Sequence, residues 1–484
     1  MIDIKNINIF ATELPKSWKI SNLEDVVDIL DRKRIPVNAK ERADRIGNIP
    51  YYGATGQVGW IDDYLFDEEL ILLGEDGAPF FDSSKQKSFI IRGKSWVNNH
   101  AHVLRALNGL PNNYIKYYLD IFDYHGYVSG TTRLKLNQTL MRKIPVPLAP
   151  PNEQSRIVVE IEKQFSRLDE AVDTLKRIKA NLKRYKASIL KDAVEGKLTE
   201  EWRKSNPNVE PAGNLLERIL VERRKKWEEA ELAKMKAKGK EPNDDKWKKK
   251  YKEPSQADIS KLNELPNEWK WLTSDQLFCF VTSGSRGWAK YYSNSGAVFL
   301  RIGNLSHDSV FLDLQKLQFV EPPRGAEGTR TRVQENDILI SITADVGMIG
   351  VIPKGFKETY INQHISLVRP VRTVNPLYIA WYLASRPGQD QFGALQRGAT
   401  KAGLGLDDIR SVNIPMPPFE EQKEIIFQIE KRLSIVDEIE IEVNKNLKRS
   451  DRLRQSILKK AFTGKLVPQI NEDESLSNSQ KQSA

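Results

Sequence analysis

The sequence contains one cysteine, Cys279, among 484 residues. No disulfide can therefore form within the chain, and a zinc site built on several cysteines is excluded. Histidine is also scarce, with five residues, so we expect no cluster of metal-ligating side chains and no metal cofactor. This composition fits a protein of the reducing cytoplasm.

Long apolar runs are missing as well. No stretch of the sequence approaches the roughly 18 residues that a membrane span requires. The segment 1–10 contains polar and acidic residues and lacks the apolar core of a signal peptide. We therefore expect a cytoplasmic chain without a membrane partner.

The chain is too long for one ordinary domain, and a hydrophobic content of 39% is sufficient for two or more buried cores. The formal net charge is +10, from 75 Lys and Arg against 65 Asp and Glu. Such an excess favours a polyanionic partner, nucleic acid first. Because the excess is modest for this length, a basic but inert surface remains open on charge alone.

An internal repeat organises the chain. Segment 153–198 aligns without a gap to segment 421–466, and 18 of the 46 aligned positions are identical. Both copies begin with Glu-Gln after a proline-rich string and end with Gly-Lys-Leu. Prolines disfavour a helix before each copy, and Gly196 and Gly464 are natural helix ends.

Each copy has an apolar residue every seven positions, which is typical of a long amphipathic helix that pairs with a partner. We predict that the two helices pair with each other as an antiparallel coiled coil; the alternative is that each packs separately on a globular domain. The predicted seam consists of Ile161, Leu168, Leu175, Leu182, Ile189, Ile429, Val436, Val443 and Ile457.

The repeat continues upstream with looser spacing. Leu-Pro-x-x-Trp-Lys occurs at 14–19 and 265–270, and an Asn-x-His string ends at His100 and at His364. Short apolar runs such as 70–73, 298–300 and 337–340 predict strands, and 114–122 and 378–383 predict helices. The fold class is therefore α+β: two α/β domains in tandem, each followed by a long helix.

The predicted boundaries are a first globular domain at 1–149, a helix at 150–198, a charged linker at 199–262, a second globular domain at 263–418, a helix at 419–468 and a disordered tail at 469–484. Segment 222–253 of the linker has 13 basic and 8 acidic residues, with a helix expected over 223–238. The linker is either a basic arm that touches DNA or a solvated tether with one exposed helix.

This organisation resembles the specificity subunit of type I restriction-modification enzymes. The resemblance covers about residues 14–468 and includes the strings Tyr-Gly-Ala-Thr-Gly at 52–56, Gly-Thr-Thr-Arg-Leu-Lys-Leu-Asn at 130–137 and Arg-Ile-Gly-Asn-Leu at 301–305. The charged linker is longer than in many relatives.

The resemblance implies a non-catalytic subunit that sets DNA specificity. Each globular domain would be a target-recognition domain that reads one half of a bipartite site in double-stranded DNA. The helix pair would space the two domains and dock two modification (methyltransferase) subunits, and motor-nuclease restriction subunits would join the complex. S-adenosylmethionine would be bound by the modification subunit, and ATP and Mg by the motor-nuclease subunit, so no cofactor is expected in this chain.

A search for catalytic motifs supports this expectation. The nearest string to an adenine methyltransferase loop is Met-Pro-Pro-Phe at 416–419, which lacks the required Asn or Asp and precedes the second helix. No phosphate-binding loop for ATP is present. His100 and His102 could suggest acid–base chemistry, but the partner at His364 favours a structural role in shaping a loop.

Glycine-containing loops supply the candidate DNA contacts, because Arg and Lys favour guanine, and Asn and Gln favour adenine, in the major groove. For each of these residues an ordinary solvated side chain is the alternative. The candidates are Thr55, Gln57, Thr131, Thr132, Arg133 and Lys135 in the first domain, and Ser285, Arg286, Arg397, Thr400 and Lys401 in the second.

Two other functions stay open at this point. One is a single-chain DNA modification enzyme fused to recognition domains, which the missing catalytic motifs oppose. The other is a coiled-coil scaffold without DNA binding, which would lack the steep salt dependence of DNA affinity.

Overall fold

A computed structural model describes residues 14–239, 242, 244–322, 325–396 and 403–469. The chain divides into two compact units, residues 1–179 with 441–484 and residues 180–440. The expected disordered tail lies almost wholly outside the described residues. In the part of the chain that is described, no helix is both long and apolar enough to cross a membrane.

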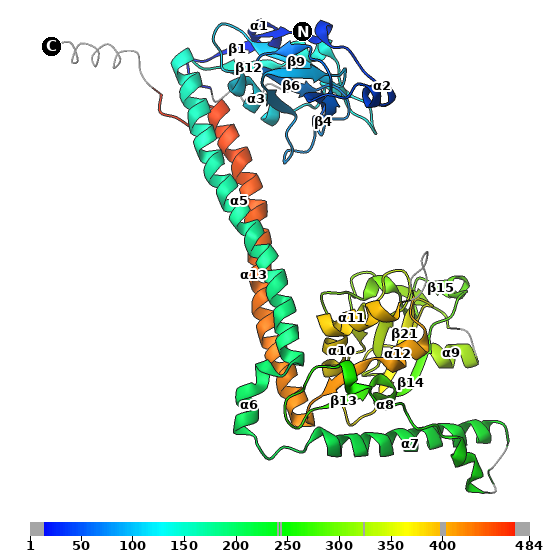
Figure 1. Ribbon diagram of the computed structural model, residues 1–484. Coiled ribbons are helices and arrows are strands. Elements are labelled where there is room, and N and C mark those ends of the chain that lie inside the picture. The colour runs from blue at the N-terminus through cyan, green and yellow to red at the C-terminus, as the bar shows by residue number, and fades with distance from the viewer. Residues whose placement is uncertain (1–13, 240–241, 243, 323–324, 397–402, 470–484) are drawn as a thin grey trace. The chain divides into compact units, whose positions relative to one another are not determined.

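The first globular domain is built on two four-stranded sheets (Figure 1). One has the order β2-β9-β6-β7 and is antiparallel, and the other has the order β4-β3-β8-β5, with β3 and β8 parallel. Its strands are β1 (Lys19–Asn22), β2 (Val27–Ile29), β3 (Ile49–Gly53), β4 (Gly56–Ile61), β5 (Phe66–Asp67), β6 (Leu70–Gly74), β7 (Ser88–Ile91), β8 (Lys94–Val97), β9 (Ala101–Ala106), β10 (Val128–Ser129), β11 (Lys135–Leu136) and β12 (Pro145–Leu148).

Helices are few in this domain. The central strand β6 is buried along its whole length, as its unbroken apolar run requires, and helix α3 packs against it. The expected helix at 114–122 is thereby observed, starting two residues earlier. The helices are α1 (Leu23–Val26), α2 (Ala39–Asp44), α3 (Asn112–Ile121) and α4 (Gln138–Arg142).

The second globular domain repeats the antiparallel sheet of the first and the parallel strand pair of its other sheet, but the fourth strand of that other sheet joins the opposite edge: β5 pairs with β8, whereas β15 pairs with β17. Its sheets have the orders β14-β21-β18-β19 and β15-β17-β16-β20, and β16 and β20 are parallel, as β3 and β8 are. The strands are β13 (Lys270–Thr273), β14 (Phe278–Ser283), β15 (Tyr292–Ser293), β16 (Ala297–Leu300), β17 (Gln318–Val320), β18 (Ile338–Ser341), β19 (Ile349–Val351), β20 (Thr359–Ile361), β21 (Ile365–Pro370) and β22 (Asn413–Met416). The helices are α8 (Ser274–Leu277), α9 (Ala326–Thr331), α10 (Pro376–Ala384), α11 (Arg386–Leu395) and α12 (Leu406–Ser411).

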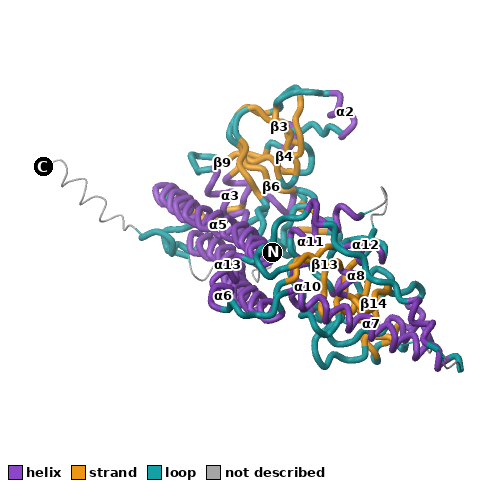
Figure 2. The backbone as a smooth tube through the Cα atoms, turned by 60° about the horizontal axis from the view of Figure 1, so that its bottom comes forward, coloured by secondary structure: helices purple, strands orange, loops and turns teal. Residues whose placement is uncertain are grey.

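The two long helices are α5 (Pro151–Val194) and α13 (Phe419–Phe462), each of 44 residues. They lie side by side in both views (Figures 1 and 2). In the first unit Lys179 donates to Asn444, and Asp169 pairs with Arg454. In the second unit Lys186 pairs with Asp437 at 2.7 Å. Residues later in α5 contact residues earlier in α13, so the two helices are antiparallel. The predicted α+β class with paired helices is therefore confirmed.

The predicted seam positions differ in burial. Ile161, Ile189, Ile429, Val436, Val443 and Ile457 are buried, whereas Leu168, Leu175 and Leu182 are half-buried. Ser450 interrupts the heptad in α13; it is buried, and its hydroxyl donates to the backbone oxygen of Asn446. A groove of about 650 Å³ lies at this interruption, lined in part by Leu168 and Leu175. The seam is therefore less tightly packed beside Ser450.

The repeated sequence strings make the same contacts in both units. The indole nitrogen of Trp18 donates to the buried carboxylate of Glu153 at 3.2 Å, and that of Trp269 donates to buried Glu421 at 2.8 Å. These contacts tie the first strand of each domain to the first turn of the helix that follows it. The Leu-Pro-x-x-Trp and Glu-Gln strings recur because each supplies one half of this buried hydrogen bond.

The ends of the long helices pack on the domain of the other half. Gly464 follows α13 and lies against Pro15, while Gly196 follows α5 and lies against Pro266. Both glycines have positive φ, 69° and 75°, which favours glycine, and a Cβ at either would overlap the proline. Each unit therefore contains the start of one long helix and the end of the other.

The charged linker forms α6 (Glu200–Ser205), α7 (Ala212–Ala237) and two short 3₁₀ turns, Asp245–Lys250 and Ile259–Lys261. Helix α7 begins eleven residues before the expected 223, because its first turns are apolar on one side. Leu215 and Ile219 are fully buried in the core of the second unit. The first turns of α7, which precede the expected helix, are therefore an integral part of the unit, whereas residues 223–238 have no buried side chain.

Candidate nucleic-acid interface

The first candidate loop joins β3 to β4. Strand pairing continues to Gly53 and Gly56, so Ala54 and Thr55 form a two-residue turn, and Gly56 has a φ of 138°. A register shift between Tyr51 and Tyr52 marks a bulge just before the turn. The predicted contacts Thr55 and Gln57 are both exposed, as a DNA-facing side chain must be.

The second candidate loop, residues 130–134, is the turn of the β10–β11 hairpin. Gly130 has a φ of 94°, and a Cβ there would collide with the backbone oxygen of Arg133. The predicted contacts of this hairpin, Thr131, Thr132, Arg133 and Lys135, are all exposed. Arg133 nevertheless forms an ion pair with Asp76 at 2.5 Å, which fixes its position although its side chain is 60% exposed.

Residues 74–78, the last residue of β6 and the four that follow it, bring these two loops together. The Cβ direction of Gly74 points at Ala78 and at the backbone oxygen of Ala54. On the other side, Gly77 donates its N–H to the oxygen of Leu134 at 2.8 Å, and Leu136 donates to the oxygen of Glu75 at 2.8 Å. The structure therefore places both candidate loops of the first domain beside one segment.

A buried charged network holds the segment 74–78 in place. His102, 1% exposed, lies with Nδ1 2.7 Å from Asp31 and Nε2 3.0 Å from the backbone oxygen of Leu136. The two ring nitrogens of His102 thus lie between two acceptor oxygens. Arg34 completes the network through Glu75, at 2.7 Å, and the backbone oxygen of Ala101.

The charge of Asp31 is central to the network. Burial alone would raise the pKa of this carboxyl, but the hydrogen bond and charge of His102, the N–H of Val103 and the charge of Arg34 outweigh burial and lower it. Asp31, Glu75 and His102 lie close enough to share a cation. Their donor atoms are already engaged by one another and by Arg34, so this cluster fits a loop support rather than a metal site.

The second domain places its candidates differently. Ser285 is half-buried and bonded to Arg330, whereas Arg286 is exposed. Arg330 also donates to the hydroxyl of Thr282 and the backbone oxygen of Ser283, both at 2.6 Å, so α9 holds this loop. The other three predicted contacts, Arg397, Thr400 and Lys401, lie outside the described residues.

Just after residues 397–402, the second domain has a counterpart of the backbone hydrogen bond that joins Leu136 to Glu75 in the first domain. Leu404 donates its N–H to the oxygen of Ile342 at 2.9 Å, which matches the bond from Leu136 to Glu75. The recurring Asn-x-His string also has one geometry in both domains: Asn98 accepts from the N–H of His100, and Asn362 from that of His364. The histidine string thus forms a turn in both domains.

Sequence reasoning missed the groups that hold these loops. No sequence motif marks Asp31 or Arg34. Arg330 lies in a short helix that the pattern of apolar residues did not indicate. Glu75 gave the one usable signal, since a carboxylate directly after a fully buried strand needs a partner.

Comparison with known proteins places these features in context. A family model described as "Type I restriction modification DNA specificity domain" matches residues 15–184 and 327–450. The EcoDI specificity subunit of Escherichia coli is 23% identical over 95% of this chain and 91% of its own length. The EcoBI specificity subunit of Escherichia coli is 24% identical over 72% of this chain and 66% of its own.

Shorter and structural matches agree. The protein S.HindORF215P of Haemophilus influenzae, named as a type I restriction enzyme specificity subunit, is 33% identical over 29% of this chain and 35% of its own length. The chain thus spans about a third of that relative and just under two thirds of EcoBI. A solved structure described as "Structural basis underlying complex assembly and conformational transition of the type I R-M system" has a TM-score of 0.60 at 15% identity, covering 94% of this chain and 99% of that one.

Proposed function

Because this chain belongs to the type I restriction modification DNA specificity family, we propose that it is the non-catalytic subunit that selects the DNA target. Each globular domain reads one half of a bipartite site in double-stranded DNA. The helix pair α5–α13 spaces the two domains and docks two methyltransferase subunits, and motor-nuclease subunits join to form the restricting enzyme.

One observation carries this proposal. The two globular domains share the antiparallel sheet, a parallel strand pair and the anchoring Trp–Glu bond, yet the loops that carry their candidate residues differ in sequence and in what holds them. A pair of unlike readers suits a target with two unlike halves. The shared sheet in two copies supports a shared task, and the unlike loops support separate sequences.

The loops supply the means of reading. In the first domain Thr55, Gln57 and the exposed Arg133 offer hydrogen bonds of the kind that base edges accept or donate in the major groove. Asp76 holds Arg133 in one direction, which reduces the entropy lost when it binds a base. In the second domain Arg286 is the exposed candidate among the described residues.

The chemistry belongs to the partners in this proposal. S-adenosylmethionine is bound by the modification subunits, and ATP and Mg by the motor-nuclease subunits, in the cytoplasm where the DNA lies. The purified chain should turn over no S-adenosylmethionine, and turnover by the chain alone would instead favour a single-chain modification enzyme.

Methylation mapping tests the proposal. The chain is expressed with its modification subunits, and N6-methyladenine is mapped across the host genome; two half-site motifs at one fixed separation should emerge. Arg133→Ala should relax one half-site by about 1–3 kcal/mol of base discrimination and leave the other half and the separation unchanged.

A matched control is Arg92→Ala, because Arg92 is similarly exposed and similarly ion-paired, with Glu69 at 2.8 Å, but lies outside both loops. Its motif should be that of the wild type. A single contiguous motif in the wild type would contradict the proposal, and loss of both half-sites with Arg133→Ala would remove this loop from base reading.

A further inference from the structure

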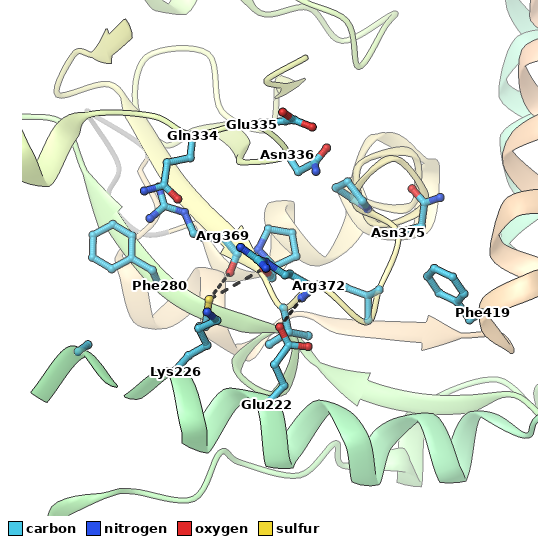
Figure 3. A pocket seen from close by; sticks show the side chains of 16 residues that line it. Glu222, Lys226, Phe280, Gln334, Glu335, Asn336, Arg369, Arg372, Asn375 and Phe419 are labelled. Carbon is cyan, nitrogen blue, oxygen red and sulfur yellow. Dashed lines mark hydrogen bonds between the residues drawn. The ribbon is translucent and has the colours of Figure 1, made fainter. Parts of the chain in front are cut away.

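The linker between the two repeats carries a hairpin with a distinctive surface. We define the linker hairpin as residues 222–239 and 244–253, the second half of α7 and the segment that returns along it. Its base is fixed to the second domain: the Glu222 carboxylate accepts from the backbone N–H of Arg372 at 2.8 Å (Figure 3) and from that of Thr373 at 3.2 Å. Arg223 adds an ion pair with Asp275 at 2.9 Å.

Aromatic side chains close the hairpin. Trp227 on α7 stacks on Trp247 with ring centres 6.0 Å apart and meets the ring of Tyr251 edge-on at 5.4 Å. Arg223 donates to the Tyr251 hydroxyl at 2.7 Å, and Trp247 is buried. The returning segment is therefore held against α7 rather than free to sample other positions.

The acidic side chains of the linker hairpin are already engaged. Glu222 binds backbone N–H groups, Glu228 and Glu253 face Arg224, and Glu229 and Glu231 pair with neighbouring lysines. Asp244 and Asp245 pair with lysines of their own turn.

A group of lysines is left over after this pairing. All are exposed, and none has an ion pair or hydrogen bond from its side chain to another described residue. They are Lys225, Lys236, Lys238, Lys249, Lys250 and Lys252. Because Trp227 meets Trp247 and Tyr251, Lys225 lies in the same part of the hairpin as Lys249, Lys250 and Lys252.

We propose that the linker hairpin binds the phosphate backbone of DNA without regard to sequence, as a third contact surface beside the two target-reading domains. The inference rests on the proposed function, which makes DNA the polyanion available to this chain. Lysine suits this task because it is a compact charge that contacts phosphates without reading bases.

A protein partner fits this surface less well. Lysine is depleted at protein–protein interfaces, whereas aromatic residues are enriched there. The aromatic residues of the linker hairpin are instead used to close it, which leaves lysines as its outward chemistry. The aromatic closure also gives the lysines a fixed position, which a passive connector would not need.

The test is a salt series on the full chain. Lys225→Gln, Lys249→Gln, Lys250→Gln and Lys252→Gln are combined in one variant, and affinity is measured by fluorescence anisotropy for duplexes with and without the target. Each lost phosphate contact lowers the slope of log affinity against log salt by about 0.9, so the slope should fall by about 3 to 4. Affinity for both duplexes should fall by the same factor.

A charge-matched control carries Lys183→Gln, Lys448→Gln, Lys459→Gln and Lys460→Gln, four exposed lysines of the long helices. Its slope should change by less than 1, and an equal fall would assign the effect to net charge and overturn the proposal. An unchanged slope in the hairpin variant overturns it too, and if that variant fails to join the modification subunits, the lysines serve a protein contact. Wild-type chain that binds DNA without salt dependence would instead contradict the proposed function.

Discussion

The two globular domains support their candidate loops with different chemistry. In the first domain a buried network of Asp31, His102, Arg34 and Glu75 lies beneath the loops. In the second domain the histidine of the repeat, His364, bonds the hydroxyl of Thr343 at 2.6 Å and the side-chain amide of Gln363, and neither partner carries a charge.

This difference shows which parts of the molecule are free to vary. The antiparallel sheet, the parallel strand pair and the Trp–Glu anchors are shared, because they are made by backbone pairing and by a few buried side chains that must all be present together. The loop supports are local, so one domain can change how it holds its loops without disturbing the sheet. The variants below compare the buried supports of the two units.

The largest effect is expected at the anchoring glutamates. Glu421 is fully buried and accepts from Trp269, Thr199 and the charged Arg203, whereas Glu153 accepts from neutral Trp18 and Gln469. Glu421→Gln leaves the guanidinium of Arg203 without its counter-charge and should lower the free energy of unfolding by about 3–5 kcal/mol.

Glu153→Gln breaks no ion pair with another described residue and should cost about 1–2 kcal/mol. Urea unfolding followed by tryptophan fluorescence measures both losses. Adding Arg203→Gln to Glu421→Gln should recover part of the stability, since it removes the unpaired charge. Equal losses for the two glutamates would mean that the ion pair with Arg203 contributes nothing.

A smaller effect is expected at the loop supports. Asp31→Asn removes the counter-charge of His102 and Arg34 and should cost about 2–3 kcal/mol, while Thr343→Ala removes one hydroxyl bond and should cost about 1 kcal/mol. In methylation mapping, Asp31→Asn should loosen the half-site read by the first domain alone.

Asp28→Asn is the matched control, because Asp28 is an exposed carboxylate of the same domain paired with Arg105 at 2.6 Å. Exposed pairs contribute about 0–1 kcal/mol, so this variant should resemble the wild type in stability and in its methylation motif. A wild-type motif for Asp31→Asn as well would show that the network stabilises the domain without shaping its loops.

The smallest effect is a pH response of opposite sign in the two domains. The pKa of Asp31 is lowered in the folded chain, so the folded state binds fewer protons just below the ordinary value of 3.8, and stability falls as the pH drops through the folded pKa. Burial raises the pKa of Asp337, with the charge of Arg369 offsetting part of the rise, so stability there falls as the pH rises through the window above 3.8.

Comparing wild type, Asp31→Asn and Asp337→Asn in urea at a series of pH values isolates the two contributions. The stability difference between wild type and Asp31→Asn should shrink toward the acid end. A difference that stays constant across the series would show that Asp31 does not change its proton occupancy on unfolding.

The sequence was sufficient to predict the long helices and the buried strand, but not the side chains that hold the loops. The long helices could be predicted because a heptad and a repeated Glu-Gln to Gly-Lys-Leu string persist over 46 positions, and β6 because its apolar run is unbroken. The pairing of Asp31 with His102 joins residues 71 apart that follow no periodicity. The docking of Glu222 on backbone N–H groups leaves no trace in the sequence, since a backbone donor has no residue identity.

Phe462, near the end of α13, is fully buried in the core of the first unit, with its ring 5.1 Å from that of Tyr114 and 5.2 Å from that of Tyr118. The ribosome adds those tyrosines some 340 residues before it adds this phenylalanine. During translation the second domain therefore has its complete set of core residues before the first one does. The domain that leaves the ribosome first is the last to be finished, and its unfilled core must wait for the final helix to emerge.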